Sequence, residues 1–223
     1  MDTGFRKSQQ TRQRIMDGYL DMMREKRWDK TTVRELCGKL HISRGTFYQY
    51  YTDIYDLVEQ AEDQLLQLLR NGYKQLTGRG GGYGVSSFFD TADSLPCPAQ
   101  FVYWFQFCRQ HEQSIGPLLS PGGEPSFRNK VKAIIQQQVA LVMERDNMPD
   151  DSIRQYFLEA MTELHILGAQ AWLSAPSDCR PDPQLLLHPI NMIRVGGCYA
   201  HYNGFYGSSS LQQLLTRGQI SVV

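Results

Sequence analysis

The chain has 223 residues, of which 41% are hydrophobic and 21% are charged. These values are ordinary for a soluble globular protein, and the length allows two all-helical domains with a substantial buried core. The net charge is zero, but residues 1–52 hold 11 Lys or Arg against 6 Asp or Glu, which leaves 12 against 17 for the rest. A basic amino-terminal part on an acidic body favours docking in one orientation on a polyanion.

Cysteine usage and hydropathy argue against a disulfide scaffold and a membrane protein. The five cysteines are an odd number without a C-x-x-C pair, so they form no disulfide framework. The amino-terminus is polar, and no apolar run approaches the ~20 residues that span a bilayer. We therefore expect a cytoplasmic protein with reduced, buried cysteines, and a thiol switch at Cys37 or Cys108 is the alternative.

The first predicted helix follows a polar start. Residues 1–10 are expected to form a loose arm, solvated unless its basic residues touch a DNA minor groove. Between Thr11 and Lys26, apolar residues recur at helical spacing: Ile15, Tyr19, Met22 and Met23. Trp28 is expected to fill the junction between this helix and the next.

The stretch from Thr31 to Leu57 contains two short apolar segments separated by a tight turn. In the first segment, one helical stripe consists of Val33, Leu36, Cys37 and Leu40. Thr32 is placed to cap this helix, and Ser43 is placed to cap a second helix from Arg44 to about Tyr51. With Phe47 turned into the core, the pattern predicts a helix-turn-helix.

The second helix of this motif exposes residue types that suit a DNA groove. Arg44 can pair with guanine in two places, Gln49 can pair with adenine, and the methyl group of Thr46 can pack on that of thymine. Hydroxyl groups suit phosphate oxygens, which position a protein on DNA without reading its sequence. A helical hairpin with merely solvated polar residues is the alternative, and the coincidence of caps, turn and polar face disfavours it.

Roughly the first seventy residues resemble the TetR family of bacterial transcriptional regulators. The matching positions are Thr32-Val33-Arg34-Glu35-Leu36, Leu40, Ile42-Ser43, Gly45-Thr46-Phe47-Tyr48, Tyr50-Tyr51 and Asp56-Leu57. The resemblance implies a homodimer that binds DNA through the second helix of the motif and is usually released by a small molecule bound in its carboxy-terminal domain. It implies base contacts from Arg44, Thr46 and Gln49, phosphate contacts from Arg34, Ser43, Tyr48 and Tyr50, and a place for Thr32 and Gly45 in the same interface.

Two positions depart from that family. A glycine is common in the turn where this chain has His41, so we expect His41 to adopt a positive φ angle, which His tolerates better than most residues. A lysine commonly opens the fourth helix where Ile54 stands here, so one phosphate contact is missing. An adaptor of the same fold that binds protein partners rather than DNA is therefore the alternative function.

A fourth helix is predicted from Asp53 to about Asn71. Residues 77–84 hold five glycines and no apolar period, which predicts a flexible linker. A phosphate-binding loop is disfavoured there because the G-K-[ST] signature and a preceding strand are missing. The expected division is 1–52 for the helix-turn-helix domain, 53–76 for the connecting helix, 77–84 for the linker, 85–203 for an effector-binding and dimerisation domain, and 204–223 for a weakly ordered tail.

The carboxy-terminal part contains a strongly aromatic segment, residues 99–113, which is apolar on nearly every side of a predicted helix. Aromatic residues in helical bundles either form core or line ligand cavities. The candidate pocket residues for an apolar or aromatic effector are Phe101, Trp104, Phe105, Cys108, Phe157, Met161 and His165. For each residue alone, plain core is the favoured interpretation, and His165 is expected to be a hydrogen-bonded interior histidine.

Three further helices are predicted, over residues 128–145, about 153–173 and about 184–202, the last bent or delayed by Pro189. Small residues on the last two allow close helix approach. In the resembled family these helices pair across a two-fold axis, which gives as candidate dimer interface Leu164, Gly168, Ala171, Trp172, Ile193, Gly197 and Ala200. Packing inside one protomer would give the same pattern.

The sequence carries no recognised catalytic or metal signature. The five histidines form no H-x-x-H or H-E-x-x-H pair, and there is no G-x-S-x-G motif. We therefore expect no enzyme activity, no cofactor and no metal site. The predicted protein is all-α, with a three-helix helix-turn-helix domain joined by a long helix to a helical bundle. Its expected function is that of a homodimeric, ligand-responsive regulator of double-stranded DNA, most often a repressor, with no membrane partner.

Overall fold

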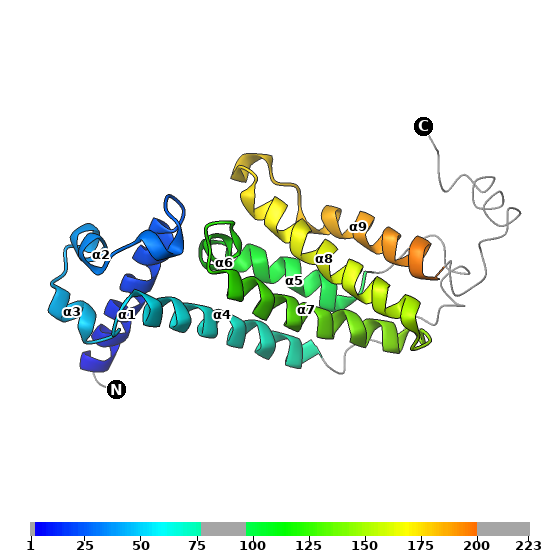
Figure 1. Ribbon diagram of the computed structural model, residues 1–223, viewed down its shortest axis with the longest axis horizontal. Coiled ribbons are helices and arrows are strands. Elements are labelled where there is room, and N and C mark those ends of the chain that lie inside the picture. Colours follow the sequence, from blue (N-terminus) through cyan, green and yellow to red (C-terminus); the bar gives the residue numbers. More distant parts are fainter. Residues whose placement is uncertain (1–2, 77–96, 200–223) are drawn as a thin grey trace, which may run out of the picture.

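The structure, a computed structural model, describes residues 3–76 and 97–199, and every regular element in these two ranges is a helix. Figure 1 shows an elongated molecule with a small head at one end, a long connecting helix and a larger body. The predicted all-α fold, two helical parts joined by a long helix, is therefore confirmed. The predicted linker at 77–84, the tail at 204–223 and the candidate interface residue Ala200 lie outside the described residues.

The head is built from α1 (Thr3–Met22), the short turn η1 (Trp28–Lys30), α2 (Val33–Leu40) and α3 (Arg44–Tyr48). Its most deeply buried side chains are Ile15, Tyr19, Leu36, Phe47 and Tyr51. The prediction of a loose arm is wrong for residues 3–10, because α1 already begins at Thr3. Trp28 is half-buried at the junction, where its ring meets that of Tyr55 edge-on with centroids 5.4 Å apart.

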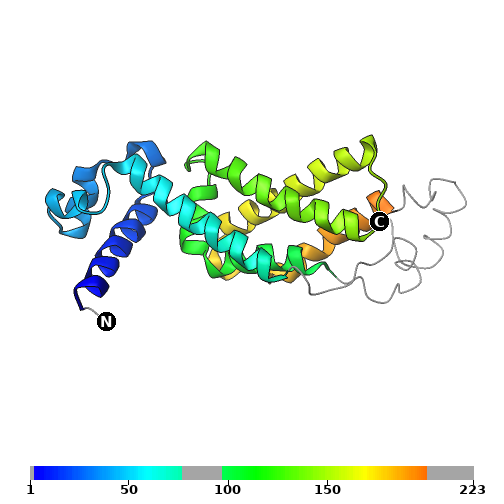
Figure 2. The same cartoon turned by 90° about the horizontal axis from the view of Figure 1, so that it is seen from below.

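The connecting helix is α4 (Ile54–Leu76), which leaves the head and continues along the body, as two perpendicular views show (Figures 1 and 2). It extends five residues beyond the predicted end near Asn71. One face of α4 is buried along its whole length, through Leu57, Val58, Ala61, Leu65, Leu66, Leu69 and Tyr73. Because one helix contributes to the packing of both parts, a rotation of the head relative to the body has to bend or displace α4.

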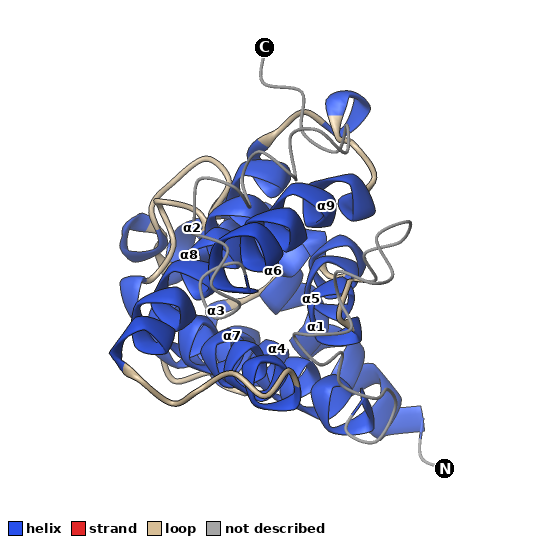
Figure 3. Cartoon of the chain, turned by 90° about the vertical axis from the view of Figure 1, so that its right-hand side faces the viewer, coloured by secondary structure: helices blue, strands red, loops and turns tan. Residues whose placement is uncertain are grey.

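The body consists of α5 (Ala99–Gln110), α6 (Glu112–Leu119), α7 (Pro125–Arg145), α8 (Ser152–Ser174), the turn η2 (Ser177–Cys179), α9 (Pro183–Ile193) and a π-helical segment, η3 (Arg194–Tyr199). Viewed along the long axis, these helices surround a common interior (Figure 3). α5 contacts α4, α7, α8 and α9. Its aromatic side chains therefore form much of the core, and Phe101, Trp104, Phe105 and Phe107 are all at most 2% exposed.

α6 is a helix that the sequence pattern did not indicate. Gly116 and Pro117 lie inside it, and both residue types disfavour a helix interior. Tertiary burial outweighs this cost, since its apolar face is almost completely enclosed by way of Ile115, Leu118 and Leu119. The loop after α6 reaches the head, where the N–H of Trp28 donates to the carbonyl of Gly122 at 2.9 Å.

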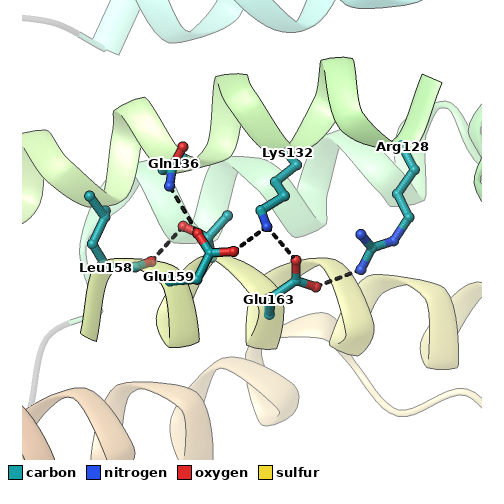
Figure 4. A network of polar contacts seen from close by, with 7 residues as sticks. Arg128, Lys132, Gln136, Leu158, Glu159 and Glu163 are labelled. Atoms are coloured by element: carbon teal, nitrogen blue, oxygen red, sulfur yellow. Dashed lines mark hydrogen bonds and ion pairs between the residues drawn. The ribbon is translucent and has the colours of Figure 1, made fainter. Parts of the chain in front are cut away.

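α7 and α8 are held side by side by a line of polar and charged side chains (Figure 4). The carboxylate of Glu163 accepts from Lys132 Nζ at 2.8 Å and from Arg128 Nη2 at 2.5 Å. Lys132 also pairs with Glu159, to which Gln136 Nε2 donates at 3.1 Å. Lys132 and then Arg128 hold the pKa of Glu163 below its ordinary value. Each partly exposed pair contributes little to stability, but together they fix the register of the two helices.

Candidate nucleic-acid interface

The first helix of the motif, α2, begins at a capping box. The Thr32 hydroxyl accepts the N–H of Glu35 at 3.2 Å, and the Glu35 carboxylate accepts the N–H of Thr32 at 3.1 Å. Lys26 Nζ lies 2.7 Å from the same carboxylate, and this pairing followed by the Thr32 bonds lowers the pKa of Glu35 to about 2. The predicted cap is therefore present, and the Thr32 hydroxyl is already engaged inside the head.

The turn of the motif depends on one left-handed residue. His41 has φ 52° and ψ 47°, as expected at a position where glycine is more common. In this conformation the N–H of Ile42 donates to the carbonyl of Cys37 at 3.1 Å, and the N–H of His41 donates to that of Gly38 at 3.3 Å. These bonds end α2 and set the angle at which α3 leaves it.

α3 is anchored by one cap and one buried ring. Ser43 Oγ accepts the N–H of Thr46 at 3.0 Å and lies 2.9 Å from the Thr46 hydroxyl. Phe47 is fully buried, and its ring centroid lies 5.5 Å from that of Tyr48 and 5.7 Å from that of Tyr51. With Phe47 held inside, the opposite side of α3 has to face solvent, and the Tyr48 side chain is 57% exposed.

The residues predicted to contact DNA all lie on α2, on α3 or directly beside them, but their exposure differs. Arg44 and Gln49 are exposed, whereas Thr46 is half-buried and its hydroxyl faces Ser43. The other predicted residues that are exposed are Thr32, Arg34, Ser43, Gly45 and Tyr48, and Tyr50 is half-buried. Among the three side chains predicted to contact bases, Arg44 and Gln49 are therefore the exposed ones.

Two arginines on this surface keep their charge unpaired by a neighbouring carboxylate. Arg34 and Arg44 make no ion pair within the part of the chain that the structure describes, whereas two lysines of the head, Lys26 and Lys39, are each paired with a carboxylate. A guanidinium group without an internal ion pair can bind phosphate or guanine without first breaking such a pair.

The start of α4 supplies carboxylates where the resembled family commonly has a lysine. Ile54 is 8% exposed and belongs to the core. Asp53 Oδ1 accepts the N–H of Asp56 at 2.8 Å, and Asp56 Oδ2 accepts the N–H of Thr52 at 2.7 Å. The first turn of α4 therefore presents negative charge where the sequence comparison led us to look for a basic side chain.

The first turns of α1, residues 3–10, add basic side chains to the surface of the head, and the sequence pattern did not predict that these residues are helical. Arg6 and Lys7 are exposed on its first turns, and the Arg12 side chain donates to Gln60 of α4. A hollow of about 760 Å³ between α1 and α4 is polar and has among its lining residues Gln9, Gln10, Gln13, Gln64 and Gln67. No apolar period precedes Ile15, which explains why residues 3–10 give no helix signal.

The candidate pocket residues of the body form a closed cluster. Phe157 is half-buried, and the other six are at most 2% exposed. These six are Phe101, Trp104, Phe105, Cys108, Met161 and His165. Trp104 Nε1 donates to the carbonyl of His165 at 3.0 Å, which joins α5 to α8. A separate hollow of about 610 Å³ lies between α1, α6 and α8, and none of the seven candidate residues lines it.

His165 is the polar group at the centre of this cluster. Its Nδ1 lies 2.7 Å from the carbonyl of Met161 and donates to it in the neutral tautomer, while Nε2 has no partner among the described residues. Burial, helped by the nearby charge of Arg194, lowers the pKa of His165 to about 4. Its ring centroid lies 4.3 Å from that of Phe101. At neutral pH, Nε2 is therefore an uncharged hydrogen-bond acceptor surrounded by aromatic side chains.

The candidate dimer-interface residues divide into two groups. A Cβ on Gly168 would lie 3.3 Å from the Phe105 ring, a Cβ on Gly197 would lie 3.2 Å from the Phe157 ring, and Trp172 is 6% exposed. Trp172 is therefore buried within one protomer, whereas Gly168 and Gly197 are half-buried and pack closely against rings of the same protomer, and the dimer interface stays a prediction. Of the other described candidates, Leu164 is half-buried, and Ala171 and Ile193 are exposed.

The described residues do not favour a metal-binding site or a reactive cysteine thiol. Among them, no group of three His, Cys, Asp or Glu side chains is placed to hold a metal ion. Cys37 and Cys108 are buried, and desolvation raises the pKa of both thiols, which disfavours the reactive thiolate. None of the described helices combines the length and apolarity needed to cross a membrane.

Comparison with known proteins shows where this fold occurs. The sequence matches no protein-family model and no curated protein. Among solved structures, a TetR-family transcriptional regulator from Streptomyces coelicolor has a TM-score of 0.53 at 17% identity, covering 93% of this chain and 89% of that one. The fatty acid degradation regulator FadR from Bacillus halodurans has a TM-score of 0.56 at 13% identity, covering 84% of this chain and 95% of that one. The chain therefore has the fold of TetR-like transcriptional regulators.

Proposed function

We propose that the chain is a homodimeric repressor that binds double-stranded DNA through α3 and is released from its operator by a small effector. One observation carries this proposal. α3 is fixed from behind by the buried Phe47 ring and presents Arg44, Tyr48 and Gln49 on the outside. The fold shared with two transcriptional regulators supports it, as does the excess of basic residues in the first 52 positions.

A direct test uses a duplex from the region upstream of the protein's own gene. The protein, freed of small molecules, is expected to bind this duplex more tightly than a scrambled one of equal length. Binding should weaken steeply between about 50 and 200 mM salt, because phosphate contacts release counterions. Arg34→Ala should reduce the salt dependence, whereas Arg70→Ala, which removes an exposed arginine of α4 from outside the motif, should not. A protein that ignores genomic duplexes under these conditions is not a DNA-binding regulator.

The second copy is proposed to pack on the outer faces of α8 and α9. These helices expose large apolar side chains, among them Tyr156 at 76%, Leu185 at 66% and Ile193 at 48%. Apolar residues exposed in a group mark an interaction surface, and a two-fold dimer covers the same patch on both copies. The candidate residues Leu164 and Ala171 also lie on α8, where Leu164 is half-buried and Ala171 is exposed beside the hollow between α1, α6 and α8.

Substitution of this face tests the dimer. Tyr156→Glu combined with Ile193→Glu should convert a dimer at micromolar concentration into a monomer in sedimentation experiments, because each charge would have to be desolvated. Leu68→Glu is the matched control, since Leu68 is 44% exposed on α4 rather than on α8 or α9. If the double variant sediments as the unaltered protein does, the interface lies elsewhere or the protein is not a dimer of this kind.

The effector is proposed to bind among the aromatic residues around His165. Its entry requires side chains to move apart, because the cluster is closed. A ligand that binds only the opened body changes DNA affinity, since it favours one arrangement of head and body over the other. The Nε2 atom of His165 offers such a ligand one hydrogen bond.

A second candidate function is that of an adaptor with the same fold, which acts through protein partners. The acidic start of α4 favours it, because Asp53 and Asp56 stand where a DNA phosphate would be approached. An adaptor would copurify with a protein partner and show no affinity for any genomic duplex. A regulator would show the opposite pair of results.

A further inference from the structure

The hollow between α1, α6 and α8 lies at the place where the head meets the body. It has a volume of about 610 Å³, within the range of small-molecule sites. Met23 and Arg24 line it from the end of the first helix, whereas Gln113 and Pro117 line it from α6. The Arg24 side chain donates to Gln113 Oε1 across this boundary. A ligand in the hollow would therefore touch both parts of the molecule at once.

The charges around the hollow leave one cation without a carboxylate partner in contact. Arg180 is fully engaged: its Nη1 lies 2.6 Å from Glu112, and its Nε and Nη2 donate to the carbonyls of Ala175 and Leu173 at 2.8 and 3.0 Å. The Arg24 side chain donates to the neutral amide of Gln113 and forms no ion pair with any residue in the described ranges 3–76 and 97–199.

Two carboxylates near Arg24 already have basic partners, since Glu112 of the hollow pairs with Arg180 and Asp21 pairs with Lys39. Asp21 is bound to Lys39, and Lys39 lowers the pKa of Asp21 more than Arg24 does. The hollow thus carries one guanidinium that an anionic ligand can pair with at little cost.

Part of the lining of the hollow is apolar. It comes from Leu167, Ala171 and Leu173 of α8 together with Pro117 of α6. The free space continues over Gly116, where an added Cβ would meet no atom within 4 Å. One unpaired cation beside apolar walls suits a molecule with a negative end and an apolar body.

We propose that this hollow binds a small organic acid, with its carboxylate on Arg24 and its apolar body on Leu167 and Pro117. The site is separate from the aromatic cluster around His165. Carboxylate binding would replace the Gln113 amide on Arg24 and so alter the contact between head and α6. The binding step stands by itself, and its effect on DNA affinity rests on the proposed function.

Three probe molecules that share one phenylbutyl group and differ in their polar end distinguish the effect of charge from the effect of shape. They are 4-phenylbutyrate, 4-phenylbutanol and 4-phenylbutylamine, titrated into the full chain and followed by calorimetry or ligand-observed NMR. We expect the carboxylate to bind about fivefold to tenfold more tightly than the alcohol, and the amine to bind most weakly. Equal affinities for all three probes would overturn the assignment of Arg24.

Two variants locate the site. Arg24→Gln should weaken the carboxylate about fivefold to tenfold and leave the alcohol unchanged, whereas Arg70→Gln, an equivalent loss of an exposed charge on α4, should change neither. Gly116→Leu should abolish saturable binding by filling the hollow. Its control is Gly38→Leu on α2 of the head, where a Cβ also meets no atom within 4 Å. Unchanged binding in both Arg24→Gln and Gly116→Leu overturns the proposal.

The DNA measurement is kept apart from the binding measurement. If 4-phenylbutyrate binds as expected and changes the affinity for the upstream duplex in the unaltered protein but not in Gly116→Leu, the hollow regulates DNA binding. If the acid binds and DNA affinity stays the same, the regulatory part of the proposal fails while the site stands. If no duplex is bound with or without the acid, the proposed function fails and the binding result is unaffected.

Discussion

Glu62 of α4 and Lys130 of α7 form an ion pair in which the carboxylate is buried and the ammonium group reaches solvent. Glu62 Oε2 lies 2.8 Å from Lys130 Nζ, with side-chain exposures of 2% and 39%. The second oxygen, Oε1, has no hydrogen-bond partner among the described residues. Desolvation raises the pKa of Glu62, and Lys130 only partly opposes this. The connecting helix is thus joined to the body through the buried Glu62 carboxylate, which would destabilise the folded protein if Lys130 were removed.

Removal of Lys130 should therefore destabilise the protein more than removal of both partners. We expect Lys130→Met to lower the free energy of unfolding by about 2 kcal/mol, below the value for fully enclosed pairs because Lys130 is partly exposed. The double variant Glu62→Leu/Lys130→Met should come within about 1 kcal/mol of the unaltered protein. Urea unfolding of the two single variants and the double variant gives the coupling energy. Equal losses in Lys130→Met and the double variant would contradict this account.

The same pair has a defined pH dependence. A carboxyl group whose folded-state pKa is raised binds protons more readily in the folded chain than in the unfolded chain, so stability falls as pH rises through that range. The deficit of Lys130→Met should therefore shrink as the pH is lowered toward the carboxyl range, because Glu62 becomes neutral. Unfolding free energies measured at neutral and mildly acidic pH decide this. A deficit that grows on acidification would mean that Glu62 is well solvated.

The left-handed turn residue allows a prediction about the motif itself. A non-glycine residue at φ 52° costs about 1 kcal/mol, so His41→Gly should stabilise the head by up to that amount. His41→Val should destabilise it by about 1–2 kcal/mol, because β-branching opposes this conformation. Asn147, at φ 55°, is the matched position in the body, and Asn147→Gly should give a smaller gain since Asn tolerates the region well. Thermal unfolding of the variants is the measurement.

The head could be predicted from the sequence because its signals are local. Thr32 and Ser43 cap helices through residues only three positions away, and the left-handed His41 follows from the resemblance, because a glycine is common at that position. α6 escaped prediction because Gly116 and Pro117 oppose a helix locally, while the burial that compensates comes from helices distant in the sequence.

Contacts between helices that lie far apart in the sequence were the second feature that the sequence pattern could not predict. Helical spacing places Gly168 on a face of its helix but cannot say that this face meets the Phe105 ring inside the same protomer. It likewise marks the aromatic residues of α5 as buried without saying whether space remains between them. The hollow at Arg24 depends on how the head docks on α6, which no spacing rule contains.

His165 should make stability depend on pH in mildly acidic solution. Its folded-state pKa of about 4 lies below the ordinary 6.5, so between these pH values His165 binds a proton in the unfolded chain but not in the folded chain. The stability due to neutral His165 is complete above about pH 6.5 and is lost as the pH falls from there toward 4, a total of about 3 kcal/mol. His165→Leu should flatten this slope, whereas His188→Leu, at an exposed histidine, should keep it. Equal slopes in the unaltered protein and His165→Leu would show that His165 does not carry the effect.

The α3 surface predicts a division between residues that read bases and residues that hold phosphates. Arg44→Ala and Gln49→Ala should each cost about 1–3 kcal/mol on the preferred duplex and much less on a scrambled one, because a lost base contact removes discrimination. Tyr48→Phe removes only a hydroxyl group from a side chain that is 57% exposed, and it should weaken binding to both duplexes by a similar factor.

Anisotropy titrations with the two duplexes at one fixed salt concentration separate these cases, and Arg70→Ala serves as the control for general loss of positive charge. If Arg44→Ala weakens both duplexes equally, Arg44 contacts the backbone, and the half-buried Thr46 with Gln49 would be left as the sequence-reading pair. If Tyr48→Phe instead changes which duplex is preferred, its hydroxyl reads a base, and α3 enters the groove at a different rotation about its own axis.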